Sequence, residues 1–172
     1  MILDVGCGRR KLSGSVGFDI SKDSDADVFG DAEVTPWSFK SESFDLVYSS
    51  HFLEHCKEPF IVLREMFRVC RYGGEVRVVV PHFSSSGGFN DLSHKHFFGY
   101  FSLEQFGSQF KGYRSQGVKP FGVLKTHLVF GRFYQMVGLD WLANLFPMVY
   151  ENFFAFIFPC REVVYSFIKV GE

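Results

Sequence analysis

The chain has 172 residues, the length of one domain, and its hydrophobic (47%) and charged (22%) shares exclude wholesale disorder. Eighteen Lys and Arg against nineteen Asp and Glu give a net charge of −1, so the composition predicts no nucleic-acid partner. The four cysteines form no CxxC pair, and the sequence shows neither a secretory leader nor a membrane-spanning run. These features predict a reducing, cytoplasmic setting.

Short apolar runs alternate with turns and helical spacing along the first half. Five runs predict strands over residues 2–5, 16–20, 26–30, 44–49 and 75–80. Apolar residues at helical spacing predict a helix over 58–71, closed by Gly73-Gly74. This alternation predicts an α/β fold, a Rossmann-like, doubly wound, mostly parallel sheet in three layers. The short stretch from Gly6 to Ser15 leaves room for about one helical turn.

The second half differs in composition, since residues 83–172 hold 22 of the 32 aromatic side chains. We predict one domain over 1–172, with a cofactor-binding half (1–82) and an aromatic-rich substrate or lid half (83–172). The elements expected in the second half are a Gly/Ser/His-rich loop over 82–100, a helix over 103–110, a strand over 121–130, a helical segment over 139–158 broken at Pro147, and an antiparallel closing strand over 162–170.

A glycine-rich turn and an acidic residue mark the ends of the first two strands. Gly6-Cys7-Gly8 follows the first strand, where glycines allow a sharp turn and close approach of a ligand. Asp19 ends the second strand, where a carboxylate can accept both hydroxyls of a ribose. Together they favour an adenosine cofactor over a tight turn with a solvated acid. Lys11 replaces the third glycine of the dinucleotide fingerprint, which favours a ligand smaller than NAD.

Several segments in the first 82 residues resemble, in order, the motifs of class I S-adenosylmethionine-dependent methyltransferases with a short crossover, the type-11-like domains. They are Leu3-Asp4-Val5-Gly6-Cys7-Gly8, Gly17-Phe18-Asp19-Ile20, Asp31-Ala32-Glu33, residues 43–55 (SFDLVYSSHFLEH) and residues 63–74. The resemblance implies a methyltransferase that uses S-adenosyl-L-methionine. It assigns to the cofactor Asp4, Gly6, Cys7, Gly8, Asp19, Ile20, Asp31, Ala32, Ser49 and Ser50. Of these, Asp19 would hold the ribose, Asp31 would meet the adenine, and Ser49 would flank the methionine.

Three histidines are candidates for catalysis. Methyl transfer from a sulfonium is an in-line displacement, in which a protein supplies alignment and, for some acceptors, a base. His51 follows the fourth strand, and His82 and His94 lie after the fifth. The alternative for the two histidines after the fifth strand is an ordered lid in which they bond to the backbone.

We predict no metal site, although two patterns could form one. His51 to His55 reads H-x-x-E-H, the inverted zinc-peptidase signature. It lies inside the methyltransferase motif, and no third ligand is evident on a nearby helix, so His55 is interpreted as a packing or capping residue. The second pattern is His94-x-His96 with Asp91, which could also hold an ion.

We therefore predict methyl transfer to a small-molecule acceptor. The alternative is a non-catalytic cofactor-binding or scaffold protein of the same fold. For the aromatic second half we favour ordinary core plus a lid. Two other interpretations remain, a pocket for an apolar or aromatic acceptor and contact with a membrane surface or another subunit. The oligomeric state stays open.

Overall fold

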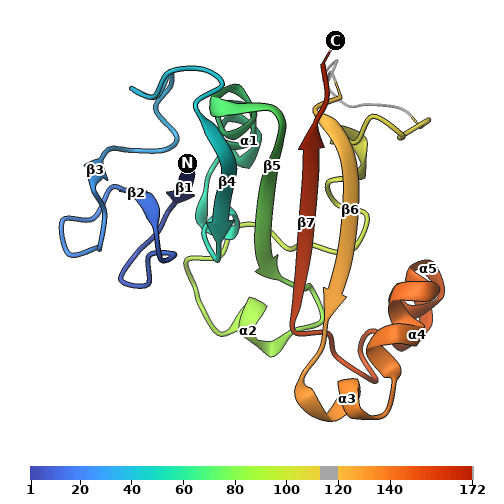
Figure 1. Cartoon of the computed structure of the whole chain (residues 1–172). Coiled ribbons are helices and arrows are strands. Elements are labelled where there is room, and N and C mark those ends of the chain that lie inside the picture. The colour runs from blue at the N-terminus through green and yellow to red at the C-terminus, as the bar shows by residue number, and fades with distance from the viewer. Residues whose placement is uncertain (113–119, 172) are drawn as a thin grey trace.

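A computed structural model describes residues 1–112 and 120–171 and shows a seven-stranded sheet in the order β3-β2-β1-β4-β5-β7-β6 (Figure 1). The strands are β1 (Ile2–Val5), β2 (Ser15–Asp19), β3 (Val28–Phe29), β4 (Phe44–Ser50), β5 (Cys70–Pro81), β6 (Gly122–Val129) and β7 (Glu162–Lys169). Strands β1 to β5 pair in parallel, whereas β7 runs antiparallel between β5 and β6. The predicted Rossmann-like, doubly wound sheet with an antiparallel closing strand is confirmed.

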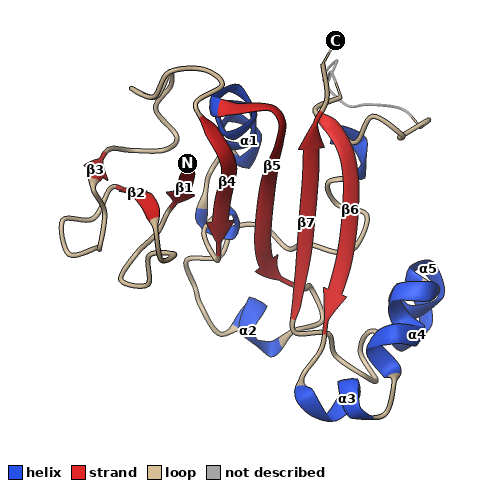
Figure 2. Cartoon of the chain, viewed as in Figure 1, coloured by secondary structure: helices blue, strands red, loops and turns tan. Residues whose placement is uncertain are grey.

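One long helix and several short helical segments accompany the sheet (Figure 2). They are η1 (Leu53–His55), α1 (Pro59–Val69), α2 (Ser86–Phe89), η2 (Glu104–Phe106), α3 (Arg132–Met136), α4 (Leu139–Leu145), α5 (Pro147–Val149) and the π-helical turn η4 (Tyr150–Phe154). The helix predicted over 103–110 is reduced to η2. Throughout the described part of the chain, no helix is long and apolar enough to cross a membrane.

Helix α1 ends earlier than its sequence pattern predicts. Cys70 already has an extended backbone and pairs with Phe44 of β4, so β5 starts directly after Val69. Gly73 and Gly74 lie within β5 and do not close the helix. Val69 and Cys70 are fully buried. Burial of this corner against β4 therefore overrides the helix-stop signal of the two glycines.

One face of the sheet carries the core. The row Val47, Val76, Phe167 and Leu124 crosses β4, β5, β7 and β6 in register, and all four side chains are buried. Phe67 of α1 packs edge-on against Phe167, with ring centroids 5.1 Å apart. The connection between β5 and β6 completes this layer with the aromatic side chains of Phe106 and Phe121, each stacked on a neighbour.

The opposite face of the sheet is not covered by a comparable layer. The next row, Tyr48, Arg77, Ser166 and Lys125, is half-buried or exposed. Helix α1 lies behind β4 and β5, and no described helix crosses the front of β4, β5 and β7 (Figure 2). The connections 6–14, 20–27 and 30–43, all within the described residues, consist of turns and bends without a helix. Within the described residues the helices therefore cover one face of the sheet, and the expected three layers are incomplete, because these connections form turns and bends instead of helices.

Two side-chain amides cover the outer edge of β6, the strand at one end of the sheet. Asn144 of α4 accepts a hydrogen bond from the Leu128 amide at 2.8 Å and donates to its carbonyl at 2.9 Å. Gln109 makes the same pair of bonds with the backbone of Leu124. Unpaired edge strands are open to association with other chains. These amides satisfy backbone groups of β6 that another strand would otherwise bind.

The segment from α3 to η4 lies at the carboxyl end of β6 (Figure 1). It is helical and broken at Pro147, as predicted, but its large apolar side chains are mostly exposed. The exposed ones include Phe133, Met136, Trp141, Phe146, Met148, Phe153 and Phe154, and the turn that follows η4 adds Phe156, Ile157 and Phe158. The favoured interpretation of the aromatic half as ordinary core is therefore correct for Phe98 and Phe106 but wrong for this segment.

Candidate functional site

The first cavity lies where strand order reverses, between β1 and β4, the usual ligand position in open α/β sheets. Gly6 follows β1 with φ of +68°, and its amide donates to the Phe18 carbonyl at 2.8 Å. A Cβ at Gly6 would stand 2.2 Å from the ring of Phe52. Both the positive φ and the close ring require glycine here.

Two carboxylates hold the glycine turn from either side. Asp19 accepts hydrogen bonds from the amides of Gly8 at 2.9 Å and Ser21 at 2.8 Å. Asp4, 3% exposed, accepts one from the amide of Leu12 at 2.7 Å. Burial raises the pKa of the Asp4 carboxyl, and the Leu12 amide opposes that shift. The turn is therefore preorganised by hydrogen bonds without a ligand.

The first cavity has a volume of about 300 Å³ and brings together five of the ten predicted cofactor residues. Its lining consists of Gly6, Phe18, Asp19, Ile20, Gly30, Asp31, Ala32, Glu33, Phe52, His55, Cys56 and Lys57. The predicted residues in this set are Gly6, Asp19, Ile20, Asp31 and Ala32. Sequence reasoning missed the wall formed by Phe52, Cys56 and Lys57. The one signal in the sequence that pointed to this wall was the SFDLV…LEH segment, which contains Phe52 and is followed directly by Cys56 and Lys57.

Five predicted cofactor residues lie outside this lining. Asp4 accepts a hydrogen bond from the Leu12 amide, and Gly8 donates one to Asp19 from within the turn. The thiol of Cys7 is buried, and this burial raises its pKa to about 11. Ser49 is 1% exposed, and its hydroxyl has no hydrogen-bond partner among the described residues. Ser50 points to the opposite face of β4. The unpaired hydroxyl of Ser49, next to the end of β1, fits a polar ligand more closely than a purely structural role.

A second cavity, of about 400 Å³, adjoins the first. It is lined by His51, Glu54, His55, Pro81, Ser85, Gly87, Asp91, His94, Arg161 and Glu162. His55 belongs to both linings. Two of the three predicted catalytic histidines, His51 and His94, lie in this cavity.

His51 is held between two carboxylates. Its backbone has φ of +52°, which is uncommon for a residue other than glycine. Its Nε2 lies 3.4 Å from Glu162, and its Nδ1 lies 3.4 Å from Glu54. The nearby carboxylates of Glu162 and then Glu54 raise the pKa of His51 to about 9. The ring is therefore protonated at neutral pH and serves as a cation in the cavity wall, not as a resting base.

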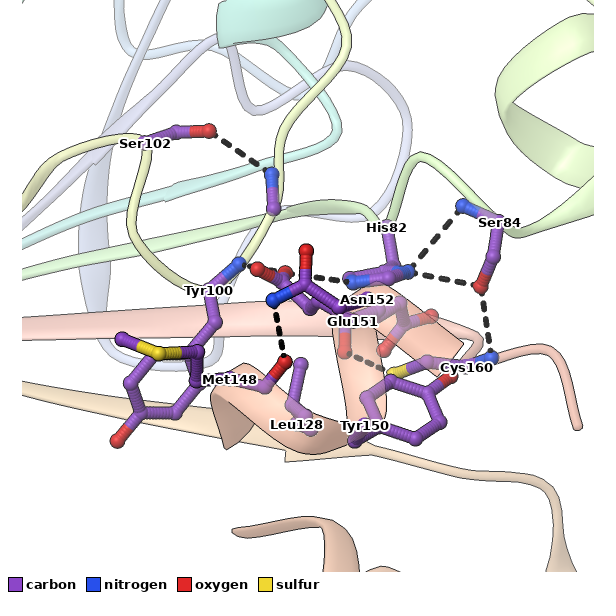
Figure 3. Close-up of polar contacts among 12 residues, drawn as sticks. His82, Ser84, Tyr100, Ser102, Leu128, Met148, Tyr150, Glu151, Asn152 and Cys160 are labelled. Atoms are coloured by element: carbon purple, nitrogen blue, oxygen red, sulfur yellow. Dashed lines mark hydrogen bonds and ion pairs between the residues drawn. The ribbon is translucent and has the colours of Figure 1, made fainter. Parts of the chain in front are cut away.

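His82 does not reach either cavity. It is fully buried, its Nε2 donates to Glu151 at 3.1 Å, and its Nδ1 contacts the Ser84 hydroxyl at 2.8 Å (Figure 3). The Ser84 hydroxyl also accepts a hydrogen bond from the Cys160 amide at 3.0 Å, and Glu151 accepts one from the Tyr100 amide. This network ties the end of β5 to η4. His82 is therefore structural, which corrects its assignment as a catalytic candidate.

The loop histidines take different positions. The Nδ1 of His94 contacts the Gly88 carbonyl at 2.9 Å, and the ring stays in the second cavity. His96 turns to the Lys57 carbonyl, 3.3 Å from its Nε2. His94 and His96 therefore do not form the ligand pair that their spacing suggested.

Comparison with known proteins agrees with the fold. Residues 3–78 match the family model described as a methyltransferase domain. Among curated proteins, none matches the chain significantly. The predicted resemblance to class I methyltransferases is therefore confirmed over residues 3–78, and the solved structures confirm the predicted fold.

Solved structures share this fold at low sequence identity. A SAM-dependent methyltransferase from Archaeoglobus fulgidus is 19% identical with a TM-score of 0.67, over 98% of this chain and 85% of that one. A phosphoethanolamine N-methyltransferase from Haemonchus contortus, bound to phosphomonomethylethanolamine and S-adenosylhomocysteine, is 16% identical with a TM-score of 0.61 (99% and 48%). The [4+2]-cyclase SpnF is 17% identical with a TM-score of 0.58 (99% and 75%).

Proposed function

We propose that this protein is a methyltransferase that binds S-adenosyl-L-methionine in the first cavity and methylates a small polar molecule in the second. The observation that carries the proposal is the shared wall. His55 lines both cavities, so the cavities adjoin, and a donor bound in one can lie next to an acceptor bound in the other. Methyl transfer between two ligands depends on this kind of proximity and alignment.

The residues of the first cavity fit an adenosine ligand with a charged amino-acid end. Each carboxylate oxygen of Asp19 accepts one backbone amide and retains a lone pair for a ribose hydroxyl. Gly6 allows the ligand to approach the backbone, and the buried Ser49 hydroxyl beside the end of β1 has no hydrogen-bond partner among the described residues. When bound, S-adenosyl-L-methionine supplies an electrophilic methyl group on sulfur.

The second cavity favours a small, polar acceptor. Its wall contains the His51 and Arg161 cations and the carboxylates of Glu54, Asp91 and Glu162. Such a lining can orient an acceptor through charge-assisted hydrogen bonds. The small polar molecule bound by the Haemonchus contortus enzyme supports the same class of acceptor.

Calorimetric titration with S-adenosylhomocysteine tests the cofactor site. Hydrogen bonds to a charged group contribute about 1.5–3 kcal/mol, so we expect Asp19→Ala to weaken binding by roughly 10–150-fold. Asp23→Ala is the matched control, because Asp23 is exposed on the following loop and outside the cavity lining. Unchanged affinity in folded Asp19→Ala, or equal affinity of the wild type for NAD, would contradict the assignment.

Turnover separates the enzyme from the scaffold alternative. Incubation with methyl-labelled cofactor and a small-molecule cell extract should transfer label to a soluble product. Saturable cofactor binding without transfer to any extract fraction would favour the scaffold instead.

A further inference from the structure

The structure brings together three side chains of metal-ligating type, of which His94 lies outside the segments that resemble methyltransferase motifs. Glu54, His55 and His94 each place one ligand atom within 4.8 Å of the other two. We propose that they bind a divalent first-row transition ion, such as Zn²⁺, at the junction of the two cavities. This proposal departs from the expectation of no metal. It also differs from the H-x-x-E-H pattern, because Glu54 and His94 join His55 as ligands while His51 lies against Glu162 and is not one of them.

Glu54 is the strongest indication of a ligand. Its side chain is 1% exposed, and neither carboxylate oxygen has a hydrogen-bond partner among residues 1–112 and 120–171. The nearest cation is the His51 ring. Its Nδ1 lies 3.4 Å from Oε1 of Glu54, which is too long for a good hydrogen bond. A buried carboxylate without hydrogen bonds is costly, and a coordinated cation offsets that cost directly.

Both imidazoles are oriented as metal ligands usually are. The Nδ1 of His55 lies 2.9 Å from the Ser93 hydroxyl, which itself donates to Asp91 at 2.6 Å. The Nδ1 of His94 lies 2.9 Å from the Gly88 carbonyl. An Nδ1–H donated to an oxygen fixes the tautomer that leaves the Nε2 lone pair for an ion, and metal-bound histidines almost always have such a partner.

The backbone explains why His94 meets the other two residues. The amides of Lys95 and His96 both donate to the Glu54 carbonyl, at 2.7 and 3.3 Å, so the loop is fixed on η1. The rings of His55 and His94 consequently lie with centroids 4.6 Å apart. Sequence spacing could not reveal this contact, because it depends on the path of the 82–100 loop.

The donor set indicates the class of ion. One carboxylate and two imidazoles suit Zn²⁺ and its first-row neighbours better than Mg²⁺ or Ca²⁺, which prefer oxygen. Metal–ligand bonds of about 2.0–2.2 Å require the three side chains to close around the ion by an ångström or more. Three protein ligands also leave a coordination position open.

The position of the site suggests what the ion would do. All three ligands line the second cavity, and His55 also lines the first. An open coordination position would therefore face the acceptor and could hold an oxygen or nitrogen of that molecule beside the donor. This role rests on the proposed methyl transfer, whereas metal binding itself does not.

Metal binding is tested on the full chain by calorimetry with ZnCl₂ and by metal analysis after dialysis. We expect one ion per chain. Glu54→Gln and His94→Ala should each weaken binding by at least about 10–100-fold, the loss seen even when only a supporting residue of a metal site is changed. His96→Ala is the matched control, because His96 belongs to the same loop but contacts Lys57.

Absence of stoichiometric Zn²⁺ from the wild type, or equal binding by folded His94→Ala, would overturn the proposal. Because Glu54 is buried, its variant could lose structure, and His94→Ala then decides alone. Titration of the same variants with S-adenosylhomocysteine separates the two proposals. Metal binding without cofactor binding would sink the methyltransferase assignment only, and the reverse result would sink the metal site only.

Discussion

The aromatic side chains of this protein form two contrasting regions. Against α1, the rings of Phe67, Phe106 and Phe167 are buried and packed on one another or on Phe121. In the segment from α3 to η4, rings of the same chemistry, such as Phe133 and Phe153, are 71% and 70% exposed. The contrast teaches that aromatic content alone does not locate a core. A face of the sheet buries the rings packed against α1, whereas within the described residues no sheet face covers the exposed rings of the segment from α3 to η4.

The largest expected effect on stability comes from replacing one aromatic residue with alanine in each of the two regions. Phe167→Ala removes a fully buried side chain from the centre of β7, and we expect it to lower the free energy of unfolding by about 3–5 kcal/mol. Phe153→Ala, the matched exposed ring, should change it by less than about 0.5 kcal/mol. Denaturant unfolding measures both, and similar costs for the two variants would break the comparison.

A smaller effect is expected at the edge of β6. Asn144→Ala leaves the amide and carbonyl of buried Leu128 without their partners, and each unpaired group costs about 1–3 kcal/mol. Asn152→Ala is the control, because its exposed side chain makes a single bond to the Met148 carbonyl. If thermal unfolding shows equal losses for the two variants, Asn144 does not protect the edge.

The smallest effect concerns the polar contacts behind the cofactor half. Glu65 accepts two hydrogen bonds from Arg68 and one from the Trp37 amide, each 2.8 Å long. Burial raises the pKa of the Glu65 carboxyl, but these bonds outweigh it and hold the pKa below its ordinary value of 4.5. A lowered pKa in the folded state means that the stabilisation is present above pH 4.5 and is lost as the pH falls through the folded value.

Glu65→Gln tests this pH dependence. The stability difference from the wild type should be largest near neutral pH, at most about 1.5–3 kcal/mol, and should shrink below pH 4.5. Glu58→Gln, at an exposed position before α1, controls for the loss of one charge. A difference that is the same at pH 7 and pH 3 would show that Glu65 acts through packing instead.

The cofactor half was predictable because its signals are local. Strands β1, β2 and β4 begin and end within one residue of their expected bounds, since short apolar runs stopped by glycine or acid fix them. Gly6 and Asp19 were found because a turn after a strand and an acid ending the next strand share one edge of a parallel sheet. The resemblance to methyltransferases rests on the same residues and the segments around them.

Other features depended on contacts between distant residues. The burial of His82, and hence its structural role, is decided by Glu151 of η4. The early end of α1 is decided by pairing of Cys70 with β4.

The sequence by itself thus determined most of the strand pattern in the first half, the glycine turn, the acid at the end of β2 and the resemblance to methyltransferases over residues 3–78. These are encoded by neighbouring residues whose backbone preferences and spacing are local. Only the tertiary structure decided that one sheet face stays without a helical layer, that the late aromatic rings face outwards, and that His94 meets Glu54 and His55. Each of these depends on where separate segments dock, and docking is set by burial and hydrogen bonds across the whole sheet.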